Sequence, residues 1–200
     1  MYYRPNKHFK IGKISTSKIE IIDIIKSWLA ISLAFTIANI GLSFNINFII
    51  LLIVSALTIG IGFLLHELAH KFAAQHYGCE AEFRSFDQML VVGVLISFLG
   101  FLFFAPGAVF ISGRVTRKEN GIVSAVGPLT NFTLAMLFLG AGILYPMLGI
   151  VSIIGFQVNL WLGLFNMIPF GNFDGKKILY WNRYIWTVMV IFGVYFIFFF

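Results

Sequence analysis

The feature that most constrains this chain is a long uncharged run that ends at a cluster of ionisable side chains. The run INFIILLIVSALTIGIGFLL occupies positions 46–65, and HELAH follows directly at positions 66–70. An apolar run of this length can cross a bilayer as a helix. An ionisable group at the centre of such a helix costs roughly 2.5 to 3.5 kcal/mol, so its presence predicts a functional site.

The composition places the whole chain among membrane proteins. Of its 200 residues, 60% are hydrophobic and 11% are charged, and the mean hydropathy is +0.93. Globular proteins average about 25% charged residues, so a lipid bilayer is the expected surrounding. The net charge of +6 could suggest nucleic acid, but the basic residues flank apolar runs, so we expect no nucleic-acid partner. The single cysteine, Cys79, excludes a disulfide within the chain.

The apolar runs predict an α-helical polytopic membrane protein with about five transmembrane helices. A basic interfacial segment is expected at 1–26, where Ser17 and Glu20 have the spacing of a capping box, and no signal peptide is expected to be removed. A transmembrane domain is expected over 27–200. The predicted crossings are 27–44, 46–77, 122–144, 147–169 and 184–200.

Segment 88–111 is apolar enough to cross, but glycine and proline interrupt it. If it crossed, six of the fourteen basic residues would lie on the far side: Arg114, Arg117, Lys118, Lys176, Lys177 and Arg183. If it enters and returns, all fourteen stay on the side of the N-terminus, as the positive-inside rule prefers. We therefore expect a re-entrant, β-hairpin-like segment at 88–111 that packs against other spans. The N-terminus and the active-site opening are then cytoplasmic, in a multi-pass protein of the cell membrane.

HELAH has the arrangement of a zinc site. Residues four apart on a helix point the same way, so His66 and His70 can hold one Zn²⁺ ion, and Glu67 lies one step round. In such HExxH sites the glutamate is the general base that takes a proton from water activated by the metal. The alternative is that the two histidines bond neighbouring helices.

Zinc needs a third protein ligand, and Asp174 is the candidate that the sequence favours. It lies in NMIPFGNFDG at positions 166–175, directly after an apolar run and on the expected side of HELAH. Its alternative role is an Asp-Gly turn that closes a helix. His76 lies about 240° round the helix from His70 and so cannot join from an unbroken helix, and Cys79 is a soft ligand that hydrolytic zinc sites seldom use.

Three motifs together resemble the site-2 protease family of intramembrane zinc metalloproteases. They are HELAH within a span, GPLTN at 127–131, and N-x-x-P-x-x-x-x-D-G from Asn166, and they cover a core of about 46–177. The resemblance implies that His66, His70 and Asp174 bind zinc and that Glu67 is the general base. The substrate would be a single-span membrane protein, cut within its transmembrane segment as in regulated intramembrane proteolysis. No PDZ or CBS domain is found in the sequence, so a compact member is expected.

The resemblance also implies roles for Asn131 and Asn166, which match family asparagines near the active site. They would contact the substrate backbone or support the metal, and the alternative is amide bonds between helices. The family has a re-entrant β element between its first two core helices, which agrees with the expectation for 88–111. Valine, isoleucine and phenylalanine in this segment predict a strand edge that holds an unwound substrate. A catalytically silent metal-binding or substrate-binding protein remains the alternative function.

Overall fold

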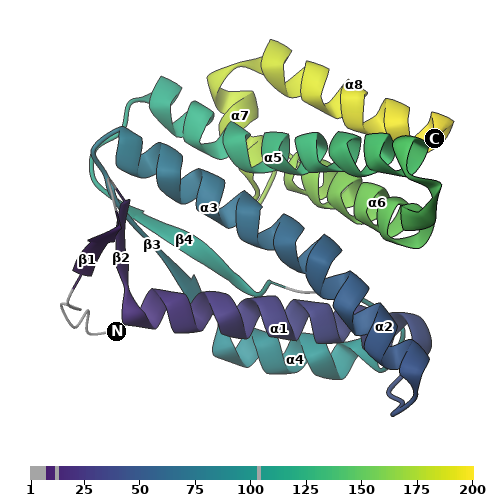
Figure 1. Cartoon of the computed structure of the whole chain (residues 1–200). Coiled ribbons are helices and arrows are strands. Elements are labelled where there is room, and N and C mark those ends of the chain that lie inside the picture. Colours follow the sequence, from purple (N-terminus) through teal and green to yellow (C-terminus); the bar gives the residue numbers. More distant parts are fainter. Residues whose placement is uncertain (1–7, 12–13, 103–104) are drawn as a thin grey trace.

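The structure, a computed structural model, describes residues 8–11, 14–102 and 105–200 and is mainly helical (Figure 1). Its elements, in chain order, are β1 (His8–Ile11), β2 (Ile14–Ser17), α1 (Lys18–Ile40), α2 (Ile46–Ser55), the π-helical turn η1 (Ala56–Gly60), α3 (Ile61–His76), β3 (Glu80–Ser85), α4 (Asp87–Ser97), β4 (Gly107–Ser112), α5 (Arg117–Leu144), the 3₁₀ turn η2 (Pro146–Leu148), α6 (Gly149–Asn166), α7 (Asp174–Trp181) and α8 (Arg183–Phe199).

The first helix starts where the sequence predicted, but its capping box is incomplete. The Ser17 side chain caps α1 by accepting a hydrogen bond from the Glu20 N–H. The Glu20 carboxylate does not complete a capping box, because it accepts from the Thr16 hydroxyl, the Lys71 ammonium and the Phe83 N–H instead. The N-terminal end of α1 is therefore tied to α3 and β3, and the helix begins at Lys18, as predicted, and continues into the expected crossing at 27–44.

The long apolar run forms one continuous rod from α2 through η1 to α3, as the prediction for 46–77 required. The π-helical turn changes the phase of the helix one turn before HELAH. The indole N–H of Trp28 donates to the Ala56 carbonyl at 3.0 Å, and Gly60 lies so close to this indole that a Cβ would sit 2.6 Å from it. The bulge is thus supported by α1, which fixes the direction in which the α3 side chains point.

The expectation of a β-hairpin at 88–111 is wrong for its first half. Residues 87–97 form α4, whose buried side chains Leu90 and Ser97, with Gly93, recur at helical spacing and face α1. Only 107–112 is a strand, and its antiparallel partner is β3, with Glu80 opposite Ser112 and Ser85 opposite Gly107. The content of valine and isoleucine does not distinguish strand from helix here, because an 11-residue helix with one buried stripe contains the same residue types.

The two ends of this segment nevertheless lie together. The pairing of β3 with β4 holds the chain before α4 beside the chain after it, and the Phe86 N–H donates to the Pro106 carbonyl at 3.1 Å. The Ser27 hydroxyl of α1 also donates to Pro106. The chain thus leaves the β3–β4 sheet along α1 and comes back to it.

The second half of the chain is a helical group in which α5 packs against α3, α6 and α7, and α8 covers α6 and α7. Within the described residues, four stretches are long and apolar enough to cross a membrane: Lys18–Ile40, Ile46–His76, Arg117–Leu144 and Pro146–Asn166. The chain is therefore a multi-pass membrane protein. Helix α8 is apolar but has 17 residues, so the fifth crossing expected at 184–200 stays a prediction.

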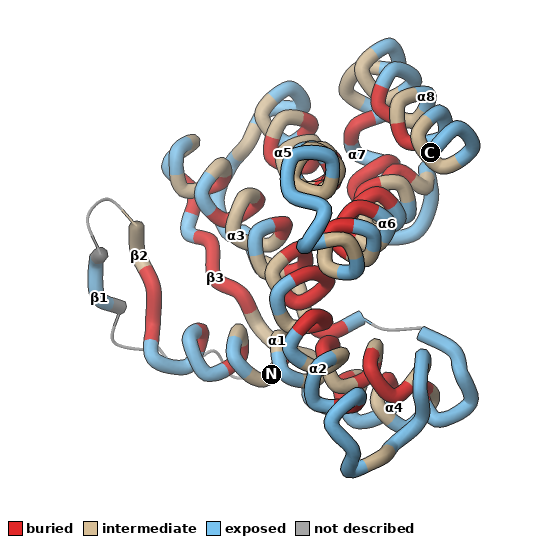
Figure 2. Tube along the Cα trace, turned by 45° about the vertical axis from the view of Figure 1, so that its right-hand side comes forward, coloured by how far each residue is buried: buried red, intermediate tan, exposed pale blue. Residues whose placement is uncertain are grey.

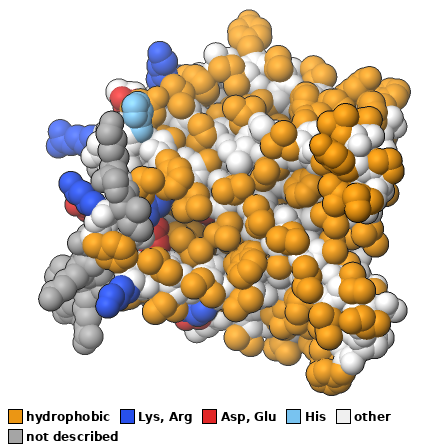
Figure 3. Space-filling view, viewed as in Figure 1, with side chains coloured by type: hydrophobic (Ala, Val, Ile, Leu, Met, Phe, Trp, Pro, Cys, Tyr) orange, Lys and Arg blue, Asp and Glu red, His pale blue; other side chains and the backbone are white. Residues whose placement is uncertain are grey.

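Buried residues lie between the helices, and charged side chains lie at one end of the molecule. Buried residues gather where α1, α3, α5 and α6 face one another, whereas the outer sides of the helices are exposed and apolar (Figure 2). On the face seen in Figure 3, charged side chains gather at the end that holds β1 and β2, and the rest of that face is hydrophobic. This separation is that of a body embedded in lipid with one charged end.

Candidate metal centre

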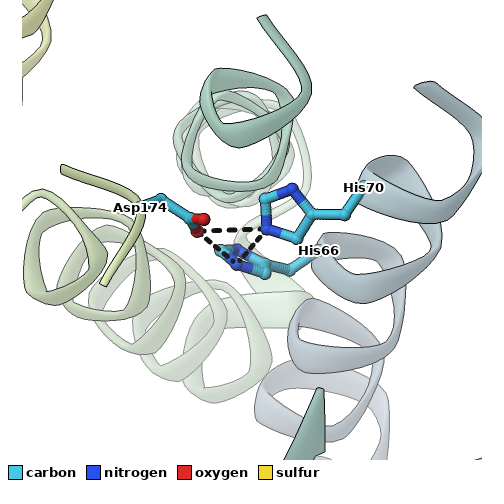
Figure 4. Close-up of side chains that lie close together, drawn as sticks. All are labelled: His66, His70 and Asp174. Atoms are coloured by element: carbon cyan, nitrogen blue, oxygen red, sulfur yellow. Dashed lines mark hydrogen bonds and ion pairs between the residues drawn. The ribbon is translucent and has the colours of Figure 1, made fainter. Parts of the chain in front are cut away.

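The structure brings together the three residues that the sequence proposes as metal ligands. His66 and His70 project from one face of α3, and their Nε2 atoms are 3.0 Å apart. Asp174, the first residue of α7, places Oδ2 at 3.4 Å from Nε2 of His66 and 3.1 Å from Nε2 of His70 (Figure 4). In the described part of the chain this is the one group of three His, Cys, Asp or Glu residues whose ligand atoms all lie within 4.8 Å of one another.

The chemistry of this donor set suits a cation. All three residues are buried, so their polar atoms are largely withdrawn from solvent. The separations of 3.0, 3.1 and 3.4 Å are close to the value of about 3.3 Å between neighbouring ligands in a tetrahedral zinc site with bonds of about 2.0 Å. Two nitrogens and one carboxylate, with the fourth position left to water, are a donor set of catalytic zinc.

Each histidine has a partner on the side away from the cluster. Nδ1 of His66 is 2.6 Å from Oδ1 of Asn131, and Nδ1 of His70 is 2.6 Å from the Val123 carbonyl oxygen, both on α5. Because both partners are acceptors, each Nδ1 carries the proton and each Nε2 presents a lone pair to the cluster. Three electron-rich atoms therefore converge with no donor between them, an arrangement that a cation stabilises.

Helix α5 can approach this closely because of Gly127 in the GPLTN motif. A Cβ on Gly127 would lie 2.3 Å from Nε2 of His70 and 2.8 Å from Cε1 of His66. Any side chain there would occupy the space of the two rings. The motif glycine thus keeps the metal side of the histidines open, and the motif asparagine, Asn131, holds one of them.

Asp174 is the start of a helix and does not close one. Phe173 has extended backbone, and α7 begins at Asp174 after the turn of residues 167–173. Gly175 packs against the backbone of Met167, where a Cβ would lie 2.1 Å from the carbonyl oxygen, so the Asp-Gly pair holds α7 against the end of α6. The carboxylate thereby enters the cluster from α7, against the two histidines of α3.

Glu67 lies beside this group and not within it. Its Oε2 accepts a hydrogen bond of 3.2 Å from the Val109 N–H of β4. Phe83, which pairs with Val109 across the sheet, directs its own N–H outward to Glu20. The two residues thus form a pair without hydrogen bonds between them, and the N–H groups on the free edge of β4 face α3. Glu67 is the residue of α3 that meets this edge.

The other residues singled out in the sequence are placed differently. The Asn166 side chain donates to Leu162 in its own helix, and no hydrogen bond of the described residues joins it to the three ligands. His76 contacts Tyr77 at the end of α3, and Cys79 is buried against other helices of the same end. Neither belongs to the cluster. The helical phase predicted this for His76, and the softness of a thiolate ligand predicted it for Cys79.

Sequence reasoning missed Asn159, which is fully buried on α6 and hydrogen-bonded to Asn131. Its only signal was an amide in an apolar span, seven residues before Asn166 and so on the same helix face. It also missed Val123, which acts through its backbone carbonyl and therefore leaves no trace in the residue type.

Comparison with curated proteins identifies relatives named as zinc metalloproteases. The chain is 39% identical over 178 residues to "Putative zinc metalloprotease MJ0611" of Methanocaldococcus jannaschii, an alignment that covers 86% of this chain and 90% of that protein. It is 24% identical over 181 residues to "Zinc metalloprotease MJ0392" of the same organism, covering 87% of this chain and 45% of the relative. "Putative zinc metalloprotease Rip2" of Mycolicibacterium smegmatis is 37% identical over 89 residues, 38% of this chain and 34% of that protein. No protein-family profile and no solved structure matches the chain.

These relatives and the convergent donor set define the class of the protein, a zinc metalloprotease and therefore a hydrolase. The motifs HELAH, GPLTN and N-x-x-P-x-x-x-x-D-G, which cover about 46–177, also resemble the site-2 protease family. The chain belongs to the site-2 protease family of zinc metalloproteases, as a compact member.

Proposed function

We propose that this metalloprotease cuts the transmembrane segment of a single-span membrane protein, in the manner of regulated intramembrane proteolysis. One observation carries the proposal: the three convergent ligand atoms are buried among helices that are apolar enough to cross a membrane. A peptide bond can reach such a site from the bilayer. A protease for soluble chains would gain nothing from a site enclosed by apolar helices, where each polar group is costly.

The residues of the site have separate roles in metal binding, proton transfer and orientation. His66, His70 and Asp174 hold one Zn²⁺ ion, which when bound supplies an acidic, activated water. Glu67 is the general base, since it follows His66 on the same helix and its carboxylate accepts the proton that water must lose. Asn131 orients His66. Asn166 is proposed to contact the substrate. In this structure its amide donates to the Leu162 carbonyl of its own helix.

The free edge of β4 offers a means of holding the substrate. A peptide bond in an intact helix is shielded by its own hydrogen bonds, so the substrate must unwind before it is cut. An extended segment gains replacement hydrogen bonds by adding to an open strand edge. This edge of β4 lies at Glu67 and so beside the metal ligands, and it replaces the helical segment 88–97 as the candidate for strand addition. An added strand would take the Val109 N–H from Glu67, which leaves that carboxylate free to act as a base.

The direct test uses purified protein and a model single-span substrate in detergent micelles. Cleavage should stop on removal of metal by a chelator and return on addition of zinc. Zinc bound at one ion per chain without any cleavage would favour the silent metal-binding alternative.

The orientation in the cell membrane is also proposed, with the N-terminus and the site opening cytoplasmic. It is supported by the charged end of the molecule and by the β3–β4 pairing, which puts Ser112 beside Glu80. A single cysteine at exposed Arg114, in a Cys79→Ser background, should react with an impermeant label from the cytoplasmic side. A cysteine at Met147, in the turn between α5 and α6, should react from the other side. The reverse pattern would invert the topology.

A further inference from the structure

The two histidines differ in how their proton positions are fixed. His70 donates Nδ1–H to a backbone carbonyl, that of Val123, which can only accept. His66 donates to a side-chain amide, that of Asn131, which has an oxygen on one side and an NH₂ group on the other. If this amide turned over, its NH₂ group would face Nδ1 of His66 and move the ring proton to Nε2, the atom that zinc needs. The site therefore requires something that holds the Asn131 amide.

A chain of hydrogen bonds across α5 and α6 supplies this constraint. Nδ2 of Asn131 donates to Oδ1 of Asn159 at 3.1 Å and to the Gly62 carbonyl at 3.1 Å. Nδ2 of Asn159 donates in turn to the Gly155 carbonyl at 2.9 Å. That backbone carbonyl can only accept, so it fixes the Asn159 amide, which then presents its oxygen to Asn131.

We propose that Asn159 is a positioning residue of the metal centre. It orients the Asn131 amide and thereby keeps the proton of His66 on Nδ1 and its Nε2 free for zinc. This inference rests on the proposed role of His66 as a ligand, and it adds a residue on a helix that contributes no ligand. Each group in this series donates to the next: the His66 imidazole to Asn131, Asn131 to Asn159, and Asn159 to the Gly155 carbonyl. The Gly155 carbonyl, which can only accept, therefore sets the orientation of both amides.

Burial prevents water from replacing Asn159, which leaves the Gly62 carbonyl as the second acceptor for the Asn131 amide. Asn131 and Asn159 are both fully buried, so water cannot replace either partner. Gly62 lies against the Asn159 amide, where a Cβ would be 2.3 Å from Oδ1, and this close approach fixes the amide beside α3. A polar side chain in an apolar span is costly without a partner, and here the two amides together donate three hydrogen bonds, to Asn159 Oδ1 and to the Gly62 and Gly155 carbonyls.

Two substitutions separate hydrogen bonding from packing. Asn159→Leu has similar volume but neither donates nor accepts, so only the Gly62 carbonyl still holds the Asn131 amide. Asn159→Asp keeps the shape, and a carboxyl group buried among apolar helices stays protonated. Its O–H can donate to Gly155 while its other oxygen accepts from Asn131. Ser152→Ala is the matched control, since the Ser152 hydroxyl is buried on the same helix and has no hydrogen-bond partner.

The first readout is the ring-nitrogen NMR spectrum of ¹⁵N-histidine-labelled, metal-free full-length protein, at a pH where the imidazoles are neutral. We expect one Nδ1–H tautomer for His66 in the wild type, Asn159→Asp and Ser152→Ala, and a mixture of tautomers in Asn159→Leu. His70 should keep Nδ1–H throughout, because its partner is a backbone carbonyl. A wild-type His66 that carries its proton on Nε2 would overturn the proposal without any variant.

The second readout is zinc affinity, measured by competition with a chelator. Substitution of an outer partner of a zinc ligand typically costs 10- to 100-fold, and we expect about tenfold for Asn159→Leu, with Asn159→Asp and Ser152→Ala near the wild type. Wild-type affinity in Asn159→Leu, or an equal loss in Asn159→Asp, would refute the orienting role. Neither readout depends on cleavage, so failure of the proposed protease function would remain distinguishable.

Discussion

The metal centre and the strand–helix–strand segment 80–112 are held in place by opposite means. In the metal centre, buried polar side chains on α3, α5 and α6 each have a defined partner, and glycines allow the helices to approach closely. In segment 80–112, α4 packs mainly against α1, and its outer residues Val91 and Leu95 are each 62% exposed. The contrast indicates a fixed site for chemistry beside a more loosely attached element that presents the strand edge.

The two regions meet at a buried ion pair. Nζ of Lys71, on α3 one residue after His70, lies 2.5 Å from Oε2 of Glu20. The other oxygen of Glu20 accepts from the Phe83 N–H of β3. The sheet is thereby anchored to the helix that bears the ligands, which explains how a loosely packed segment can still place Val109 at Glu67.

The largest expected effect concerns the chemistry. Glu67→Gln should retain zinc, because all three proposed ligands remain, yet reduce cleavage by about 10²- to 10⁴-fold, the usual contribution of a general base. Metal analysis and cleavage of the same sample provide the measurement. Turnover close to that of the wild type would remove Glu67 from the mechanism.

A smaller but still large effect is expected for the third ligand. Asp174→Asn replaces an anion by a neutral amide, so zinc affinity should fall by at least the 10- to 100-fold that outer partners cost, and activity should fall with it. Chelator competition measures the affinity. Unchanged metal binding would show that Asp174 does not contact the metal.

An intermediate effect should appear at the free edge of β4. Val109→Pro removes the N–H that faces Glu67 but none that pairs with β3, so the sheet should survive. The loss of one backbone hydrogen bond, about 0.5–1.5 kcal/mol, predicts a two- to tenfold loss of cleavage with zinc retained. Val109→Ala keeps the N–H and separates the side-chain contribution. Equal activity of the proline and alanine variants would argue against strand addition.

The smallest effect is expected where α4 is tied to α1 at the surface. Lys26 bridges Asp23 at 3.0 Å and Asp87 at 2.7 Å, with side chains that are 38% exposed for Lys26 and 68% for Asp87. Exposed ion pairs contribute about 0–1 kcal/mol, so Asp87→Asn, which leaves the pair between Lys26 and the buried Asp23 in place, should change the unfolding free energy in detergent by no more than that. Destabilisation of several kcal/mol would mean that α4 is held as firmly as the metal centre.

The same contrast explains what could be predicted from the sequence. The spacing of His66 and His70 follows from helix geometry, and the family motifs supply Asp174 and Asn131, so the cluster could be proposed in full. Asn159 and the Val123 carbonyl could not, because their roles depend on how α5 and α6 pack. The helix at 87–97 was mistaken for a strand because a short apolar run carries little periodic information, whereas the basic residues did indicate that the chain returns.

The most direct test of the account is to locate the cleavage sites in a single-span substrate. Wild-type protein and Glu67→Gln are reconstituted with the substrate in liposomes, and new termini are mapped by mass spectrometry. The account predicts termini inside the membrane-spanning segment of the substrate, formed only by the wild type and only with zinc. Termini confined to the parts of the substrate outside the membrane, or the same internal termini formed by Glu67→Gln, would contradict it.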